Sequence, residues 1–175
     1  LKTIDRLFGL HLTIREADER INYAIDWLIN RMLELKVDTP DTVITNFDIE
    51  YPIPFVPSKH RYFIQGATLF LASIFGREAQ PEIISTYETL VKEASNKGGI
   101  WHDWNCTSNI FRAFVVHPTF SYNSVTIATV NSLSKIQDGN GEWSGLPFYQ
   151  TVNALAHLSL PEADQQLEKA FSRLV

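Results

Sequence analysis

The sequence predicts an all-α protein built from repeated helical hairpins. The main indication is a pair of matching turns, Gly99 to Trp101 and Gly141 to Trp143, which read Gly-x-Trp and lie forty-two residues apart. Each turn follows a segment with helical spacing of apolar residues and precedes a second, more apolar segment. Sequence repeats of about 20 to 50 residues are typical of stacked supersecondary units. The repeat therefore restricts the fold more strongly than any single residue does.

Length and composition indicate one globular domain. The chain has 175 residues, of which 45% are hydrophobic and 20% charged, and its formal net charge is -5. These proportions are ordinary for a folded domain and differ from those of a disordered chain. Lysine and arginine are scattered, with no basic run beside aromatic residues, so no nucleic-acid partner is expected.

Cysteine usage and the length of the apolar stretches indicate the cellular setting. Cys106 has no second cysteine to pair with, which favours a reducing compartment, and we expect a cytoplasmic location. The longest apolar stretches, 69–75 and 111–116, are far shorter than the ~20 residues that a transmembrane helix needs. The sequence therefore predicts no transmembrane segment.

The first predicted helix covers Ile14 to Leu35, where apolar residues recur every three or four positions. Thr13 has the residue type of an N-cap, and Glu16 completes the spacing of a capping box. After this helix, residues 37–60 contain four prolines, which remove backbone donors and disfavour helix. We expect a long loop there, with its aromatic side chains, Phe55 among them, lying against the body of the protein.

The repeat region covers residues 61–175 of a single domain that covers residues 1–175. In it, strongly apolar inner helices alternate with amphipathic outer helices. The predicted order is inner 61–75, outer 81–94, inner 107–116, outer 124–136, inner 148–158 and outer 161–175. Residues 124–136 contain β-branched side chains that also suit a strand, but the position of this segment in the repeat favours a helix.

The second turn resembles a known family motif. Residues 137–143 read Gln-Asp-Gly-Asn-Gly-Glu-Trp, which resembles the glutamine-tryptophan motif of squalene cyclases, oxidosqualene cyclases and related terpenoid cyclases. In that family, as in the β subunits of protein prenyltransferases, helical hairpins form an α/α toroid around an apolar cavity. The resemblance extends best over residues 85–175. It implies a partial α/α toroid of about three and a half hairpins.

The motif residues have a structural role that explains them without catalysis. The Gln137 side chain can satisfy backbone groups at a helix end, and Gly141 permits a tight reversal. Trp101 and Trp143 supply broad apolar contact between neighbouring hairpins. We therefore expect these residues to hold the hairpins together. The first copy departs from the motif because Ser95 takes the glutamine position.

The catalytic signatures of the resembled family are missing from this sequence. It has no Asp-x-Asp-Asp segment, which protonates the substrate in terpenoid cyclases, and no Asp-Asp-x-x-Asp segment, which binds magnesium and diphosphate. The nearest acidic pair, Asp48 and Glu50, lies in the proline-rich loop. The candidate catalytic residue is instead Asp103, in a polar segment at the start of an inner helix.

Metal binding is an alternative role for the same segment. Protein prenyltransferases hold zinc with an Asp, a Cys and a His, and Asp103, Cys106 and His157 have these atom types at a different spacing. The simpler interpretation is that Asp103 caps the helix, Cys106 packs as a small apolar residue and His157 lies on an apolar face. On that interpretation we expect no cofactor.

The resemblance leaves two functional hypotheses open. In the first, which the resemblance favours, the chain is part of or derived from an enzyme that acts on an isoprenoid, and aromatic inner-helix residues line its cavity. In the second, it is a non-catalytic module that binds a lipid, an isoprenoid or a protein, and those rings are ordinary core. An open arc exposes its ends, so further toroid repeats, another domain or a homodimer partner are expected. The aromatic residues in question are Trp104, Phe111, Phe114, Phe148 and Tyr149.

Overall fold

The computed structural model describes residues 2–11, 18–35, 55 and 60–173. In this part of the chain it contains eight α-helices, two short 3-10 helices and no strand, which confirms the all-α prediction. The α-helices are α1 (Lys2–His11), α2 (Glu19–Glu34), α3 (Arg61–Ile74), α4 (Pro81–Ala94), α5 (Trp104–Val116), α6 (Ser124–Ile136), α7 (Phe148–Leu155) and α8 (Pro161–Ala170). The 3-10 helices cover Phe120–Tyr122 and Phe171–Arg173.

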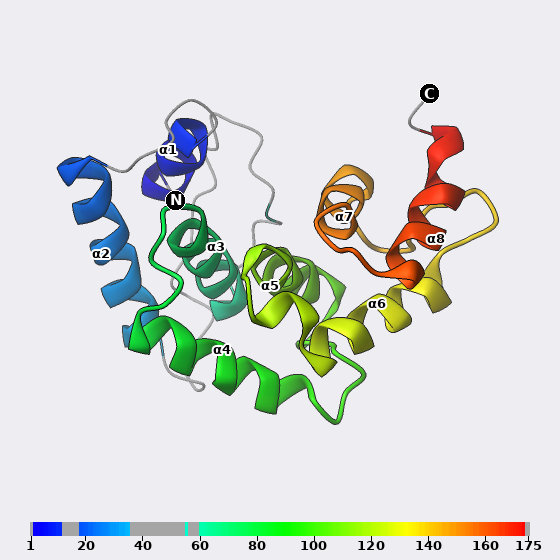
Figure 1. The fold of residues 1–175 in the computed structure, drawn as a ribbon, viewed down its shortest axis with the longest axis horizontal. Coiled ribbons are helices and arrows are strands. Elements are labelled where there is room, and N and C mark those ends of the chain that lie inside the picture. Colours follow the sequence, from blue (N-terminus) through cyan, green and yellow to red (C-terminus); the bar gives the residue numbers. More distant parts are fainter. Residues whose placement is uncertain (1, 12–17, 36–54, 56–59, 174–175) are drawn as a thin grey trace.

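The helices alternate between two rows that bend into an arc (Figure 1). α1, α3, α5 and α7 form the inner row, in which each helix packs against the next. α2, α4, α6 and α8 form the outer row, on the convex side. None of these helices is long and apolar enough to cross a bilayer.

The repeat region follows the predicted order closely. α4 and α6 have the bounds that the sequence predicts, and α5 begins three residues earlier than predicted, at Trp104. The earlier start has a local cause, because Asp103 is the N-cap and its side chain accepts a hydrogen bond from the backbone N–H of Cys106. α6 is helical despite its β-branched residues, since Asn123 caps it and Val125 is buried against neighbouring helices.

The N-terminal region differs from the prediction in two ways. α1 was not predicted from the sequence, and it forms the first helix of the inner row. The helix predicted from Ile14 begins instead at Glu19, because Asp18 is extended and accepts a hydrogen bond from Ile21 N at 2.9 Å. The predicted capping pair, Thr13 and Glu16, lies outside the described residues.

The two Gly-x-Trp turns occupy equivalent places in successive hairpins. Gly99 and Gly141 both have positive φ, 76° and 80°. Gly99 lies against Thr129 on α6, the next outer helix, and Gly141 lies against Ala170 at the end of α8, again the next outer helix. Close backbone approach of this kind needs glycine, because a Cβ would overlap the neighbouring helix.

The tryptophans of both turns are buried. Trp101 is 1% exposed, and its indole N–H donates to Leu90 O on α4 at 2.9 Å. Trp143 is 3% exposed, and its indole N–H donates to the Gln166 side chain on α8 at 3.0 Å. Gln137 strengthens the second turn, because its Nε2 donates to Gln166 O at 2.8 Å. The turns therefore join adjacent helices through both packing and hydrogen bonds.

The core extends along the whole inner row. Phe55 is 1% exposed and its ring packs edge-on against Phe70 of α3 at 5.3 Å, so this aromatic residue of the proline-rich segment lies against the body as expected. α3 and α5 approach so closely at Gly66 that an added Cβ would lie 2.5 Å from Asn109 O. The inner helices α3 and α5 are therefore in direct contact.

Candidate functional site

Three potential metal ligands meet at the start of α5. His102 Nδ1 lies 3.6 Å from Cys106 Sγ and 3.4 Å from an Asp103 side-chain oxygen. The ligand atoms of all three residues lie within 4.8 Å of one another. An imidazole nitrogen, a thiolate and a carboxylate oxygen are all groups that bind zinc in proteins. The geometry is thus compatible with one divalent ion held by three side chains.

The backbone before α5 creates this arrangement. Asp103 is extended and caps the helix, with its Oδ1 accepting from Cys106 N at 2.7 Å. His102, immediately before it, has a positive φ of 55°, which is uncommon for a residue with a side chain. The cap and the turn together bring the imidazole, the carboxylate and the thiol into one cluster.

The electrostatics of Asp103 suit a cap or a metal ligand. Partial burial acts to raise the pKa of the carboxyl group, but the hydrogen bonds from Cys106 and the nearby His102 outweigh it. The net result is a pKa below the ordinary value for aspartate. The carboxyl group is therefore ionised at neutral pH, whereas an acid that protonates an alkene must hold its proton.

A stack of rings connects the cluster to α3. The His102 ring stacks on the His60 ring at 4.5 Å, and His60 stacks in turn on Tyr62 at 4.6 Å. The Tyr62 hydroxyl donates to Glu93 on α4, and burial raises the pKa of this tyrosine to about 12. Glu93 also forms an ion pair with Arg61 at 2.8 Å. These contacts fix one side of the His102 ring.

His157 lies in different surroundings from Asp103 and Cys106. Its Nδ1 is 2.7 Å from Asn153 O and 3.3 Å from Arg112 Nη1. The structure thus brings together Asp103 and Cys106, with His102 as the neighbouring imidazole. Sequence reasoning missed His102 as a ligand, although it is adjacent to Asp103 and lies only four residues before Cys106.

Three of the five predicted aromatic lining residues pack against core residues. Phe114 is fully buried, and its ring makes an edge contact with Tyr87 at 4.9 Å. Phe111 is 3% exposed and belongs to the core shared by α5 to α8. Phe148 packs beside Trp143 at 5.9 Å. The other two differ, since Trp104 is half-buried and Tyr149 is exposed.

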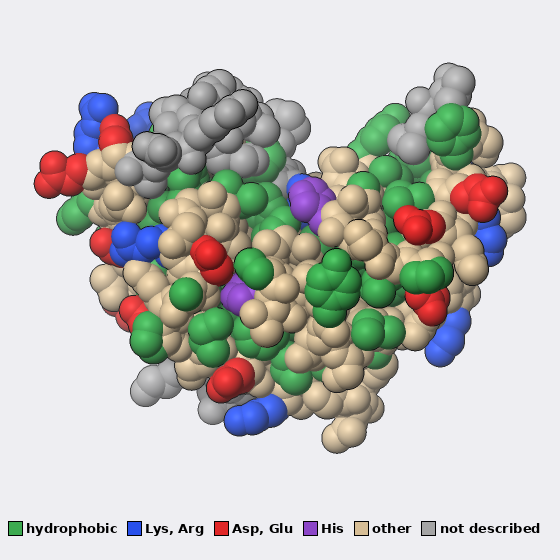
Figure 2. All heavy atoms as spheres, in the orientation of Figure 1, with side chains coloured by type: hydrophobic (Ala, Val, Ile, Leu, Met, Phe, Trp, Pro, Cys, Tyr) green, Lys and Arg blue, Asp and Glu red, His purple; other side chains and the backbone are tan. Residues whose placement is uncertain are grey.

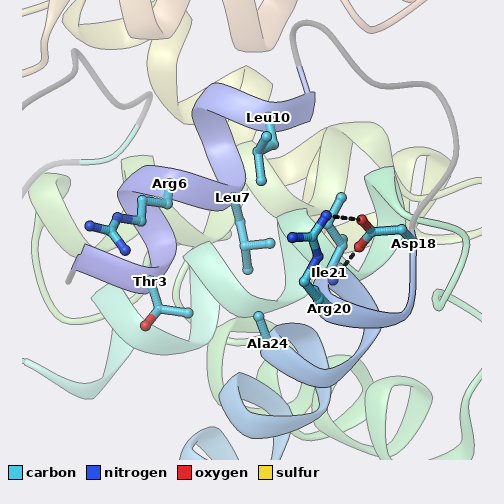
Figure 3. A pocket seen from close by; sticks show the side chains of 8 residues that line it. All are labelled: Thr3, Arg6, Leu7, Leu10, Asp18, Arg20, Ile21 and Ala24. Carbon is cyan, nitrogen blue, oxygen red and sulfur yellow. Dashed lines mark hydrogen bonds and ion pairs between the residues drawn. The ribbon is translucent and has the colours of Figure 1, made fainter.

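A pocket of about 510 Å³ lies between α1 and α2. Its floor is apolar, and Figure 3 shows Leu7 and Leu10 extending from α1 toward α2. Ile21 and Ala24 contribute from the α2 side. The rim is polar and includes Arg20, which is hydrogen-bonded to the α2 cap. Among the described residues, the lining consists of Thr3, Arg6, Leu7, Leu10, Asp18, Arg20, Ile21 and Ala24.

These features define an all-α protein built from helical hairpins that are joined by equivalent tryptophan turns. Comparison of the chain with models of protein families, with curated proteins and with solved structures found no match. The features of the molecule that bear on function are therefore the pocket, the cluster before α5 and the charges of the inner row.

Proposed function

We propose that this chain is a helical-repeat module that binds an apolar small molecule of the isoprenoid or lipid class in the pocket between α1 and α2. The observation that carries the proposal is the pocket itself, with a volume of about 510 Å³ and an apolar floor. Small-molecule sites typically have volumes of about 300 to 1,000 Å³, mostly apolar walls and a few polar groups.

Two features favour binding over proton-initiated catalysis. The Asp103 side chain is engaged as a helix cap and has a lowered pKa, which makes it a poor proton donor at neutral pH. Phe111 and Phe114, which the enzyme hypothesis assigns to a cavity wall, are buried among core residues. The equivalent Gly-x-Trp turns support the toroid-like architecture that the sequence motif implies, without requiring a reaction.

The test is to fill the pocket. We expect the Ala24→Trp variant to bind squalene, farnesyl diphosphate or geranylgeranyl diphosphate at least about tenfold more weakly than the wild type, because the indole occupies the ligand volume. The matched control is Asn30→Trp, which places the same side chain at an exposed position of the same helix. Binding is measured by equilibrium dialysis with radiolabelled ligand.

Two results would contradict the proposal: no saturable binding of any of these ligands to the wild type, or equal binding by Ala24→Trp. Incubation with the same compounds, with and without magnesium or zinc, is expected to give no product. Turnover would instead favour the enzyme hypothesis.

A second candidate function, zinc binding, is favoured by the cluster of His102, Asp103 and Cys106. Because binding to the folded state stabilises it, we expect zinc at 100 times its dissociation constant to add about 2.7 kcal/mol to the free energy of unfolding. The check is cobalt titration, which gives a thiolate charge-transfer band when Cys106 is a ligand. The band should vanish in His102→Ala and persist in His157→Ala, and the reverse pattern would assign His157 as the imidazole ligand in place of His102.

A further inference from the structure

Arg112 is a buried charge on the inner row. It is 8% exposed, and it lies on α5 between two neighbouring inner helices. Its guanidinium carbon is 5.2 Å from the centre of the Phe70 ring on α3, and its Nη1 is 3.3 Å from His157 Nδ1, just after α7. In the described part of the chain, no carboxylate forms an ion pair with Arg112.

The hydrogen-bond donors of Arg112 also lack good acceptors among the described residues. Nε is buried and has no partner among the described residues. His157 Nδ1 is closer to Asn153 O, at 2.7 Å, and a carbonyl oxygen can only accept, so Nδ1 must carry the proton. A protonated Nδ1 cannot accept from Arg112 Nη1. The guanidinium group therefore keeps several donors for another acceptor.

Burial does not remove the charge. Desolvation lowers the pKa of Arg112 to about 10, which leaves the guanidinium group protonated at neutral pH. A buried charge is strongly unfavourable unless an opposite charge and hydrogen bonds compensate it. Such a group, without a carboxylate partner among the described residues, points to an anion that arrives from solution.

The charge pattern of the helices is consistent with an anion on this side of the arc. The chain contains 20 acidic and 15 basic residues, yet three of the four inner helices, α3, α5 and α7, contain no aspartate or glutamate; the fourth, α1, contains Asp5, which is 4% exposed. The acidic residues of the repeat helices lie instead on the outer helices α4 and α8. The space-filling view shows a notch in the upper edge of the molecule, beside the end formed by α7 and α8 (Figure 2). An anion there would meet no carboxylate from these three inner helices.

We propose that Arg112 anchors a binding site for an oxyanion, a phosphate or carboxylate group, on the concave side of the arc between α3 and α7. The Nε and Nη atoms of a guanidinium group form a planar fork that binds two oxygen atoms of such a group at once. This site is separate from the pocket between α1 and α2 and does not depend on the proposed function.

The test uses inorganic phosphate and acetate as probes at constant ionic strength, with chloride as the balancing anion. In ¹⁵N-labelled protein we expect the Arg112 Nε–H signal to shift saturably with at least one probe, because the proton gains an acceptor. The same probe should raise the Tm of the wild type and of Arg31→Gln, a surface control. It should not raise the Tm of Arg112→Met. A response to phosphate but not acetate assigns a phosphate group, and the reverse assigns a carboxylate.

Two results would overturn the proposal. One is an Arg112 Nε–H signal that neither probe shifts, and the other is an Arg112→Met variant whose Tm rises with the probe as it does in the wild type. If Arg112→Met does not fold, Arg112→Lys serves in its place, because it keeps the charge but loses the planar fork. It should then bind the probe about tenfold more weakly, and unchanged affinity would exclude the two-oxygen contact.

Discussion

The Gly99→Ala and Gly141→Ala variants should each lose roughly 3 to 5 kcal/mol of unfolding free energy, among the largest costs of a single substitution. At Gly99 the added Cβ would lie 2.5 Å from Thr129 N and 2.7 Å from Val125 O, both backbone atoms of α6. At Gly141 it would lie 2.6 Å from Ala170 Cα. Backbone atoms of a packed helix cannot move aside cheaply, and both positions also need positive φ.

Other glycines of the chain separate the two causes of destabilisation, which are overlap with neighbouring backbone atoms and the need for positive φ. Gly145 has positive φ but no atom within 4 Å of an added Cβ, so Gly145→Ala should cost roughly 1 kcal/mol. Gly139 has open space and no positive φ, so Gly139→Ala should change stability by less than about 0.5 kcal/mol. Urea unfolding measures all four variants. A Gly99→Ala cost no larger than that of Gly145→Ala would mean that the turn does not pack against α6.

The Trp101→Ala variant should lose about 3 to 5 kcal/mol of unfolding free energy, because it removes a buried ring and leaves a cavity between α4 and α5. Trp101 is 1% exposed and contacts Phe114 at a centroid distance of 5.2 Å. The variant also leaves Leu90 O, which accepts from the indole N–H, without its buried partner.

The control is Trp27→Ala, on the exposed face of α2. Trp27 is 49% exposed, so its loss should cost less than about 1 kcal/mol. Denaturant midpoints and slopes for both variants give the comparison. If the two variants were equally stable, Trp101 would not hold α4 and α5 together, and the structural interpretation of the Gly-x-Trp repeat would be wrong.

Local sequence features were sufficient to predict most of the helices. Pro81 and Ala94 bound α4 as predicted, because a proline at the first helical position and a steady helical spacing act over only a few residues. The β-branched residues of α6 were ambiguous until their place in the repeat was considered. α1 was missed, although Ile4, Leu7 and Phe8 recur at helical spacing within its ten residues.

The functional residues were only partly predictable. The capping role of Asp103 is local, since its carboxylate reaches a backbone N–H three residues later, and the sequence indicated it. The stacking of His102 on His60 joins residues forty-two positions apart, and no spacing rule predicted it. His157 was grouped with Cys106 from its residue type, but the fold places it beside Arg112.

The sequence by itself determined the all-α class, the order of inner and outer helices and the turns that need glycine and tryptophan. Each of these depends on the spacing of residues along one segment, which the chain carries wherever it folds. The tertiary structure decided that Arg112 lies buried between Phe70 and His157 and that α1 and α2 form a pocket. These properties arise only when separate helices pack, because burial and the lack of an opposite charge depend on every neighbour that surrounds a group.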